Sequence, residues 1–340
     1  MKMMHSLPQL PPPACRFIKS ALFFIVAAIP AHAQDYSFTN TKINAPGKYQ
    51  LTAAPSYAWF SSKMSVGLDG KVLLTCSFTD SMPSNGFLWI LDSTGKTLGM
   101  TEDVGRTVRN ATSNAKGIVA LVVQHSDHAV VFYDAKANMI TEDSEYSQGR
   151  EYEGAGFANP QSVRAGPSGK FYAYDLYGKQ IVVYSDSGKR ESAIPLQMIE
   201  GGELEFVKGQ LYPDEKNKRF FLIDTKGFLH LFDAEGKMTG SPHKLPGIST
   251  VTGEGRVYSY NASKAMLVEI SPDAGDAIAE IPIEHERYNE NDPDTFEDFI
   301  GIHGDKLFLH RHHPYELFKV YDVSSGSLLE VINAEHTAVE

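Results

Sequence analysis

The feature that most constrains the fold of this chain is a short pattern that occurs six times. Each copy is an alternating apolar strand followed by a polar turn with Asp or Ser and a nearby Gly. Aligned on their turn residues, the copies recur every 38 to 51 residues; these residues are Asp92, Asp134, Ser185, Asp233, Ser271 and Asp322. One unit of this length cannot bury its own apolar faces, so the period indicates units that stack or close into a ring.

Within each copy, further apolar stretches alternate with period two and are separated by Gly, Asp, Asn and Ser. This pattern is typical of antiparallel strands joined by tight turns. Six four-stranded units predict an all-β fold, a six-bladed β-propeller, because a closed ring leaves few open sheet edges. A seventh blade would need more than one strand from residues 36–55. That stretch otherwise adds one strand to the last blade or lies on the outside.

The third copy resembles a known repeat family. The segment Asn159–Lys189, NPQSVRAGPSGKFYAYDLYGKQIVVYSDSGK, is similar to the NHL repeat of six-bladed propellers, with Pro160, Gly169, Asp175 and Gly188 at the expected places. The match is good over roughly 30 residues, whereas the second copy lacks the turn glycine. The resemblance implies the fold but no single function, because such propellers include scaffolds, sensors, lyases and lactonases.

The first 33 residues have the pattern of a cleaved export signal. Basic residues precede the apolar stretch Ser20–Ile29, and Ala31-His32-Ala33 supplies small residues at the cleavage positions. An uncleaved anchor is the alternative. We expect residues 34–340 to form a single β-propeller domain in a periplasmic or secreted protein. Two sequons, beginning at Asn110 and Asn261, would matter only if the source glycosylates exported proteins.

The charge balance disfavours some partners. The formal net charge is −11, and loss of the signal removes three positive charges and no acidic ones, which leaves −14. Such an acidic surface repels phosphate backbones, so we expect no nucleic-acid partner. The longest aliphatic run after the signal is Ile118–Val123, which predicts no membrane span.

Two histidine-rich segments are candidate metal sites. On the expected topology, His125, Asp127 and His128 follow the second strand of the second blade, and His310 and His312 occupy the same place in the sixth. Three imidazoles and a carboxylate suit zinc or another borderline metal. The alternative is a solvated polar loop.

Calcium is the second possible cofactor. The acidic run Glu284–Asp298 offers oxygen ligands but lacks an ordered ligand spacing, so a charged loop is the alternative. In lyase-type propellers, histidines of the inner strands hold zinc, and here only His303 lies near an expected inner strand.

Two arginines on expected inner strands are candidate ligand-binding residues. Arg109 and Arg164 each follow a valine in these strands. If both point toward the central channel, their guanidinium groups would favour a carboxylate or a phosphate there. They could instead form structural ion pairs with acidic residues such as Glu153 or Glu205.

These observations predict a function only at a coarse level. No nucleophile, catalytic dyad or cofactor motif stands out, so we predict an exported module that recognises a protein or a small ligand through its polar loop face. The alternative is a metal-assisted hydrolase or lyase, with His125, His128, His310 and His312 as ligands.

Overall fold

In the computed structural model, strands that follow one another in the sequence pair into six antiparallel blades of four strands each. The structure describes residues 39–44, 60–78, 85–101, 104, 107–124, 129–143, 151–152, 156–157, 160–197, 207–284, 299–310 and 316–335. Within these residues the strand order of every blade is the order in the chain, so neighbouring strands are joined by short connections. The prediction of a six-bladed, all-β propeller is therefore confirmed.

The strands of the first three blades are β2 (Phe60–Val66), β3 (Val72–Phe78), β4 (Asn85–Leu91), β5 (Thr97–Met100), β6 (Thr107–Ser113), β7 (Val119–Gln124), β8 (Ala129–Tyr133), β9 (Met139–Asp143), β12 (Pro160–Ala165), β13 (Phe171–Asp175), β14 (Gln180–Tyr184) and β15 (Arg190–Pro195). Between the second and third blades, β10 (Glu151–Tyr152) and β11 (Gly156–Phe157) form a separate small hairpin.

The strands of the last three blades are β16 (Gly209–Asp214), β17 (Arg219–Asp224), β18 (Phe228–Asp233), β19 (His243–Lys244), β20 (Ile248–Val251), β21 (Val257–Asn261), β22 (Met266–Ile270), β23 (Ala277–Pro282), β24 (Phe299–His303), β25 (Lys306–His310), β26 (Glu316–Asp322) and β27 (Leu328–Glu335).

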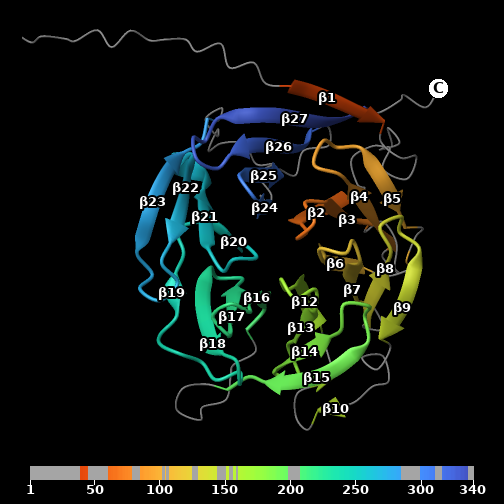
Figure 1. The fold of residues 1–340 in the computed structure, drawn as a ribbon, viewed down its shortest axis with the longest axis vertical. Coiled ribbons are helices and arrows are strands. Elements are labelled where there is room, and N and C mark those ends of the chain that lie inside the picture. Colours follow the sequence, from red (N-terminus) through yellow and green to blue (C-terminus); the bar gives the residue numbers. More distant parts are fainter. Residues whose placement is uncertain are drawn as a thin grey trace, which may run out of the picture. The chain divides into compact units, whose positions relative to one another are not determined.

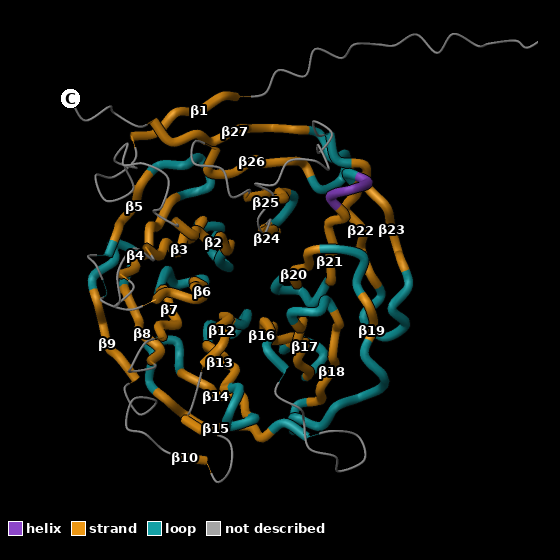
Figure 2. The backbone as a smooth tube through the Cα atoms, turned by 180° about the vertical axis from the view of Figure 1, so that it is seen from behind, coloured by secondary structure: helices purple, strands orange, loops and turns teal. Residues whose placement is uncertain are grey.

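The first strand of each blade lies nearest the centre of the ring (Figure 1). Residues Tyr36–Glu340 form one compact unit. The described part contains one 3-10 turn, Ala262–Lys264, as its helical element (Figure 2). None of its helices is long and apolar enough to cross a bilayer.

Six apolar clusters hold the blades together, one at each junction between neighbours. The cluster between the second and third blades, for example, contains Phe132 and Phe171, whose ring centroids are 5.4 Å apart. The cluster between the first and last blades contains Trp89 and Phe308, which are both fully buried. The ring is therefore closed by side-chain packing, which removes the apolar faces of all six blades from water.

Polar side chains of the inner strands tie neighbouring blades together. The Ser65 hydroxyl donates to the Ala111 carbonyl at 2.6 Å, the Asn110 side chain accepts from the Val163 amide at 2.9 Å, and the Ser162 hydroxyl accepts from the Leu211 amide at 3.0 Å. Such bonds satisfy buried polar groups and fix the offset between strands. Because Asn110 is only 8% exposed and already bonded, the first sequon is closed to glycosylation in the folded protein.

The repeated turn joins the third and fourth strands of each blade. In the first blade, Asp92 Oδ1 accepts hydrogen bonds from the amides of Thr94 and Lys96, both at 2.9 Å. Gly95 completes the turn with a φ of 83°. In the second blade the same place is taken by Ala137, whose φ is 66°. The second blade, which lacks the turn glycine, therefore has an alanine held in the left-handed region of φ/ψ space.

The segment before the first blade contributes one strand. Strand β1 (Thr39–Asn44) pairs in parallel with β27, the outermost strand of the last blade, from Thr39 opposite Glu330 to Asn44 opposite Glu335. Of the two expectations for residues 36–55, the added strand is the one found within the described residues.

Candidate functional site

A pocket of about 230 Å³ opens at the centre of the ring. The ends of the inner strands and the turns that follow them line this pocket, and all six blades contribute. Its lining residues are Val66, Gly67, Leu68, Thr112, Arg164, Ala165, Tyr212, Pro213, Thr250, Val251, Thr252, Gly253, Glu254, Ile300, Gly301, Ile302, His303 and Gly304. Each blade begins with its inner strand, and the ends of the six inner strands meet around this pocket.

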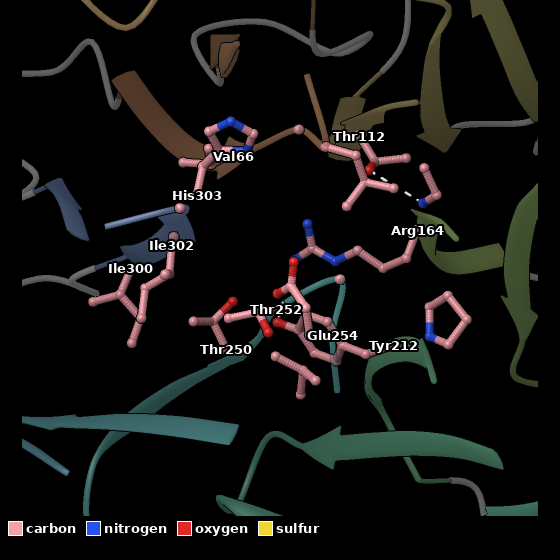
Figure 3. Close-up of a pocket in the computed structure, with 18 residues that line it drawn as sticks. Val66, Thr112, Arg164, Tyr212, Thr250, Thr252, Glu254, Ile300, Ile302 and His303 are labelled. Atoms are coloured by element: carbon pink, nitrogen blue, oxygen red, sulfur yellow. Dashed lines mark hydrogen bonds between the residues drawn. The ribbon is translucent and has the colours of Figure 1, made fainter. Parts of the chain in front are cut away.

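Arg164, on β12, extends from the third blade toward the middle of this pocket (Figure 3). Its Nη2 donates to Gln210 Oε1 at 2.7 Å and to the Tyr212 hydroxyl at 3.2 Å. The Tyr212 hydroxyl also donates to Gln210 Oε1 at 2.8 Å, and the guanidinium carbon lies 4.7 Å from the centroid of the Tyr212 ring. Neutral groups of the fourth blade thus hold the cation in place.

The positive charge of Arg164 has no carboxylate partner among the described residues. Its buried Nε makes no hydrogen bond, and its Nη1 has no partner in the described part of the chain either. A guanidinium has five N–H donors and keeps its charge at any ordinary pH. The site can therefore donate to an anion that enters the pocket.

Arg164 differs from the residues in the same position of other blades. The turns after the inner strands close through matching bonds, such as Gly70 N to Gly67 O and Gly169 N to Gly166 O. In this alignment Arg164 corresponds to three small hydroxyl residues, Ser65, Thr112 and Thr250. Ser65 and Thr112 bond to the backbone of the next blade's inner strand, at 2.6 and 3.3 Å. A short side chain is thus enough for the structural bond, and the arginine reaches beyond it.

Close to the pocket residues Ala165 and Pro213, Glu215 in the turn after β16 joins the fourth blade to the third. Its carboxylate accepts from the Ser168 amide at 2.7 Å, the Ser168 hydroxyl at 2.6 Å and the Tyr172 hydroxyl at 2.7 Å. Burial, and next the nearby Glu215 carboxylate, raise the pKa of Tyr172 well above its usual value, so the phenol keeps its proton. The third and fourth blades are therefore joined directly next to the pocket.

The remaining lining combines apolar and polar groups. Glu254, exposed in the turn after β20, is the carboxylate of the pocket, and His303 lies at the end of β24. In Figure 3 His303 and Ile302 approach from the side opposite Arg164. Cationic, anionic and apolar groups in one small cavity can orient a ligand as well as hold it.

The structure places three of the sequence-predicted site residues. Arg164 is in the pocket, as described above. Arg109 lies at an irregular point of β6, between Val108 and Asn110, with its side chain exposed. His310 is fully buried on β25, where its ring is 6.1 Å from that of Phe299. The other candidates, His125, Asp127, His128 and His312, lie outside the described residues.

The described candidates are not gathered at one point. His310 pairs with Phe299, at the start of β24, whereas the pocket residue His303 is at its end. Arg164 is on the pocket side, next to the turn that follows β12. Within the described ranges, no three His, Cys, Asp or Glu side chains lie close enough to hold a metal ion. Zinc at the histidines and calcium at the run after Glu284 stay predictions.

Gln210, Tyr212 and Glu254 are functional candidates that the sequence alone does not reveal. These residues come from the fourth and fifth blades, and their distance from Arg164 depends on how the blades are offset in the ring. The sequence carries no local signal for these three residues, whereas alignment of the repeats on the inner-strand turns sets Arg164 apart as an arginine among small hydroxyl residues.

No model of a known protein family matches the chain, and no curated protein matches it in sequence. Among solved structures, a catalytically inactive virginiamycin B lyase from Staphylococcus aureus, determined with quinupristin, is similar with a TM-score of 0.50 and 13% identity, over 85% of this chain and 88% of that one. A nidogen/laminin complex matches with a TM-score of 0.48 and 12% identity, over 79% and 100%. A protein of unknown function from Bacteroides caccae matches with a TM-score of 0.32 and 9% identity, over 82% and 84%. The likeness to the lyase shows that the chain shares the β-propeller fold, and at this identity it shows the fold alone.

Proposed function

We propose that this protein is an exported recognition module that binds an anionic group in its channel pocket. The group belongs to a small ligand or to one side chain of a partner protein. The observation that carries this proposal is the guanidinium of Arg164, held by Gln210 and Tyr212 without a carboxylate partner among the described residues. Neutral partners position a cation but leave its charge available to a ligand.

The size of the pocket supports a small ligand. Its volume of about 230 Å³ is below the roughly 300–1,000 Å³ of pockets that enclose drug-sized molecules. A carboxylate or phosphate on a short chain fits such a space, and so does the end of an acidic side chain. The apolar residues Val66, Ile300 and Ile302 would contact the remainder of the ligand.

The groups described around the pocket favour binding over chemistry. Catalysis by a nucleophile needs a base within hydrogen-bonding distance of it, and metal-assisted hydrolysis needs a cluster of ligands. The pocket residue that is held most firmly is instead an arginine, whose planar guanidinium suits the binding of carboxylate and phosphate groups.

Replacement of Arg164 by Gln tests the proposal. Acetate and inorganic phosphate serve as probes, and calorimetry measures their binding to the full-length protein. We expect Arg164→Gln to weaken binding of the preferred anion about 10- to 100-fold, because a hydrogen bond to a charged group contributes about 1.5–3 kcal/mol. The melting temperature changes little, because Arg164 is half-buried and its partners are neutral.

Arg256→Gln is the matched control. Arg256 also lies over a tyrosine, with its guanidinium carbon 5.2 Å from the Tyr258 centroid, but it already pairs with Glu269 at 2.6 Å. This variant keeps full anion binding if the proposal is right. A sharp fall in melting temperature for Arg164→Gln, with anion binding intact in the folded protein, would show that Arg164 is structural.

A further inference from the structure

We infer that the ligand of the channel pocket is a small zwitterion, with a carboxylate that binds Arg164 and an ammonium group that binds Glu254. The inference rests on the proposed function and names the class of ligand. It starts from an arrangement in which two opposite charges line one pocket of about 230 Å³ and do not pair with each other.

The backbone of Glu254 is held in place by its turn. The Gly255 amide donates to the Thr252 carbonyl at 3.0 Å, and the Arg256 amide donates to the Thr252 hydroxyl at 3.3 Å. Gly255 has a φ of 79°, and a Cβ at this position would lie 2.5 Å from Cγ of the buried Asp214. The turn is thus packed against the fourth blade with no room for a side chain at Gly255, which fixes the backbone from which Glu254 extends.

The two charged residues are anchored on different blades. Arg164 belongs to the third blade and is oriented by Gln210 and Tyr212 of the fourth, whereas Glu254 belongs to the fifth. Among the described residues Glu254 forms no ion pair with Arg164, although its charge also acts on the exposed Arg256 two residues along the chain. Elsewhere in the same blade, by contrast, Arg256 and Glu269 pair through two hydrogen bonds of 2.8 and 2.6 Å. Arg164 and Glu254 thus line the same pocket without bonding to each other, and Arg164 has neutral partners only.

The charges of the pocket select between ligand classes. A simple carboxylate is attracted by Arg164 but meets the carboxylate of Glu254, and a phosphate with two negative charges meets it more strongly. A primary amine is attracted by Glu254 but repelled by Arg164. A molecule with a carboxylate at one end and an ammonium at the other satisfies both charges, and the apolar residues Ile300 and Ile302 would contact the short chain between them.

Three probes of matched length test this inference with the full-length protein. They are γ-aminobutyrate, butyrate and butylamine, and saturation-transfer NMR at millimolar concentrations measures the affinity of each. We expect γ-aminobutyrate to bind at least about tenfold more tightly than butyrate, the change that corresponds to about 1.4 kcal/mol, and butylamine to bind weakest because Arg164 repels it.

Two variants separate this inference from the proposed function. Glu254→Gln should remove the advantage of γ-aminobutyrate and strengthen butyrate binding, whereas Arg164→Gln should abolish binding of both acids. Glu269→Gln, which removes a carboxylate already paired with Arg256, should leave all affinities unchanged.

Different results would contradict the zwitterion inference and the proposed function. If Glu254→Gln leaves the ratio of the two acids unchanged while Arg164→Gln weakens both, the ligand is a simple anion; the zwitterion inference fails and the proposed function stands. If Arg164→Gln affects neither acid, or if no probe shows saturation transfer, both are overturned.

Discussion

At the scale of single residues, one position departs from the repeat on which the fold is built. Ala137 occupies the turn between the third and fourth strands of the second blade with a φ of 66°, where the other five blades have a glycine with a φ between 72° and 87°. An L-residue in this region costs about 1–2 kcal/mol because its Cβ crowds the following carbonyl. The alanine was visible in the sequence, but its strain depends on a turn geometry that only the structure shows.

We therefore expect Ala137→Gly to stabilise the protein by about 0.5–1 kcal/mol. The value is smaller than the full strain because glycine also raises the entropy of the unfolded chain. Urea denaturation measures the change. The control is Ala193→Gly, on the exposed part of β15, where glycine relieves no strain and should destabilise. Equal effects of the two substitutions would contradict the argument.

At the scale of elements, the turns with aspartate link stability to pH. Asp322 Oδ1 accepts hydrogen bonds from the Ser324 hydroxyl at 2.6 Å and from the amides of Ser324 and Ser325 at 2.9 and 2.8 Å. These donors, first the Ser324 hydroxyl, lower the pKa of Asp322 below 3.8. The Asn138 side chain, followed by its backbone amide, lowers the pKa of Asp134 in the same way. Since the folded state holds these carboxylates more acidic than the unfolded chain does, they add stability above the unfolded pKa.

This stability is lost as the pH falls through the lowered pKa values of the folded state. We expect the melting temperature to be constant above about pH 5 and to fall steadily toward pH 3. Asp322→Asn keeps an acceptor oxygen but cannot titrate. It should therefore lower stability at pH 7 and make the fall in melting temperature between pH 5 and pH 3 less steep. If the melting temperature of the variant falls as steeply below pH 5 as that of the unsubstituted protein, the argument from Asp322 is wrong.

The elements also show how far sequence reasoning extends. Strand alternation and turn residues such as Asp92 and Asp322 predicted six blades because these signals are local. Arg164 was found because it stands next to a turn that marks the end of an inner strand. Tyr212 and Glu254 were missed because their place beside Arg164 depends on how blades pack, which no local pattern records. The burial of the sequon residue Asn110 could not be seen in the sequence for the same reason, since its side chain bonds to the next blade.

At the scale of the whole propeller unit, the central question is what closes the ring. The last blade takes all four of its strands from the C-terminal part of the chain, so the first blade gives it no strand. Strand β1 is the fifth strand of the last blade's sheet and pairs with β27 on its outer edge. The junction of the first and last blades is instead the apolar cluster that contains Trp89, Phe308 and Phe318. Closure is therefore a matter of packing, and the edge strand is an addition to a complete ring.

Two substitutions distinguish packing from strand addition. Phe308→Ala removes a fully buried ring from the closing cluster and should cost about 3–5 kcal/mol. Thr41→Pro, in the middle of β1, interrupts the pairing opposite Ile332 and should cost about 1 kcal/mol, the net contribution of a typical hydrogen bond. Phe221→Ala, equally buried between the fourth and fifth blades, is the control for Phe308→Ala and should be as damaging, because it removes the same kind of fully buried ring from another junction of the closed ring. Thr41→Pro should also leave ligand binding in the pocket unchanged, since β2 and β24 meet the channel without β1. If Thr41→Pro instead destabilises the protein as much as Phe308→Ala, the parallel strand is what holds the ring shut.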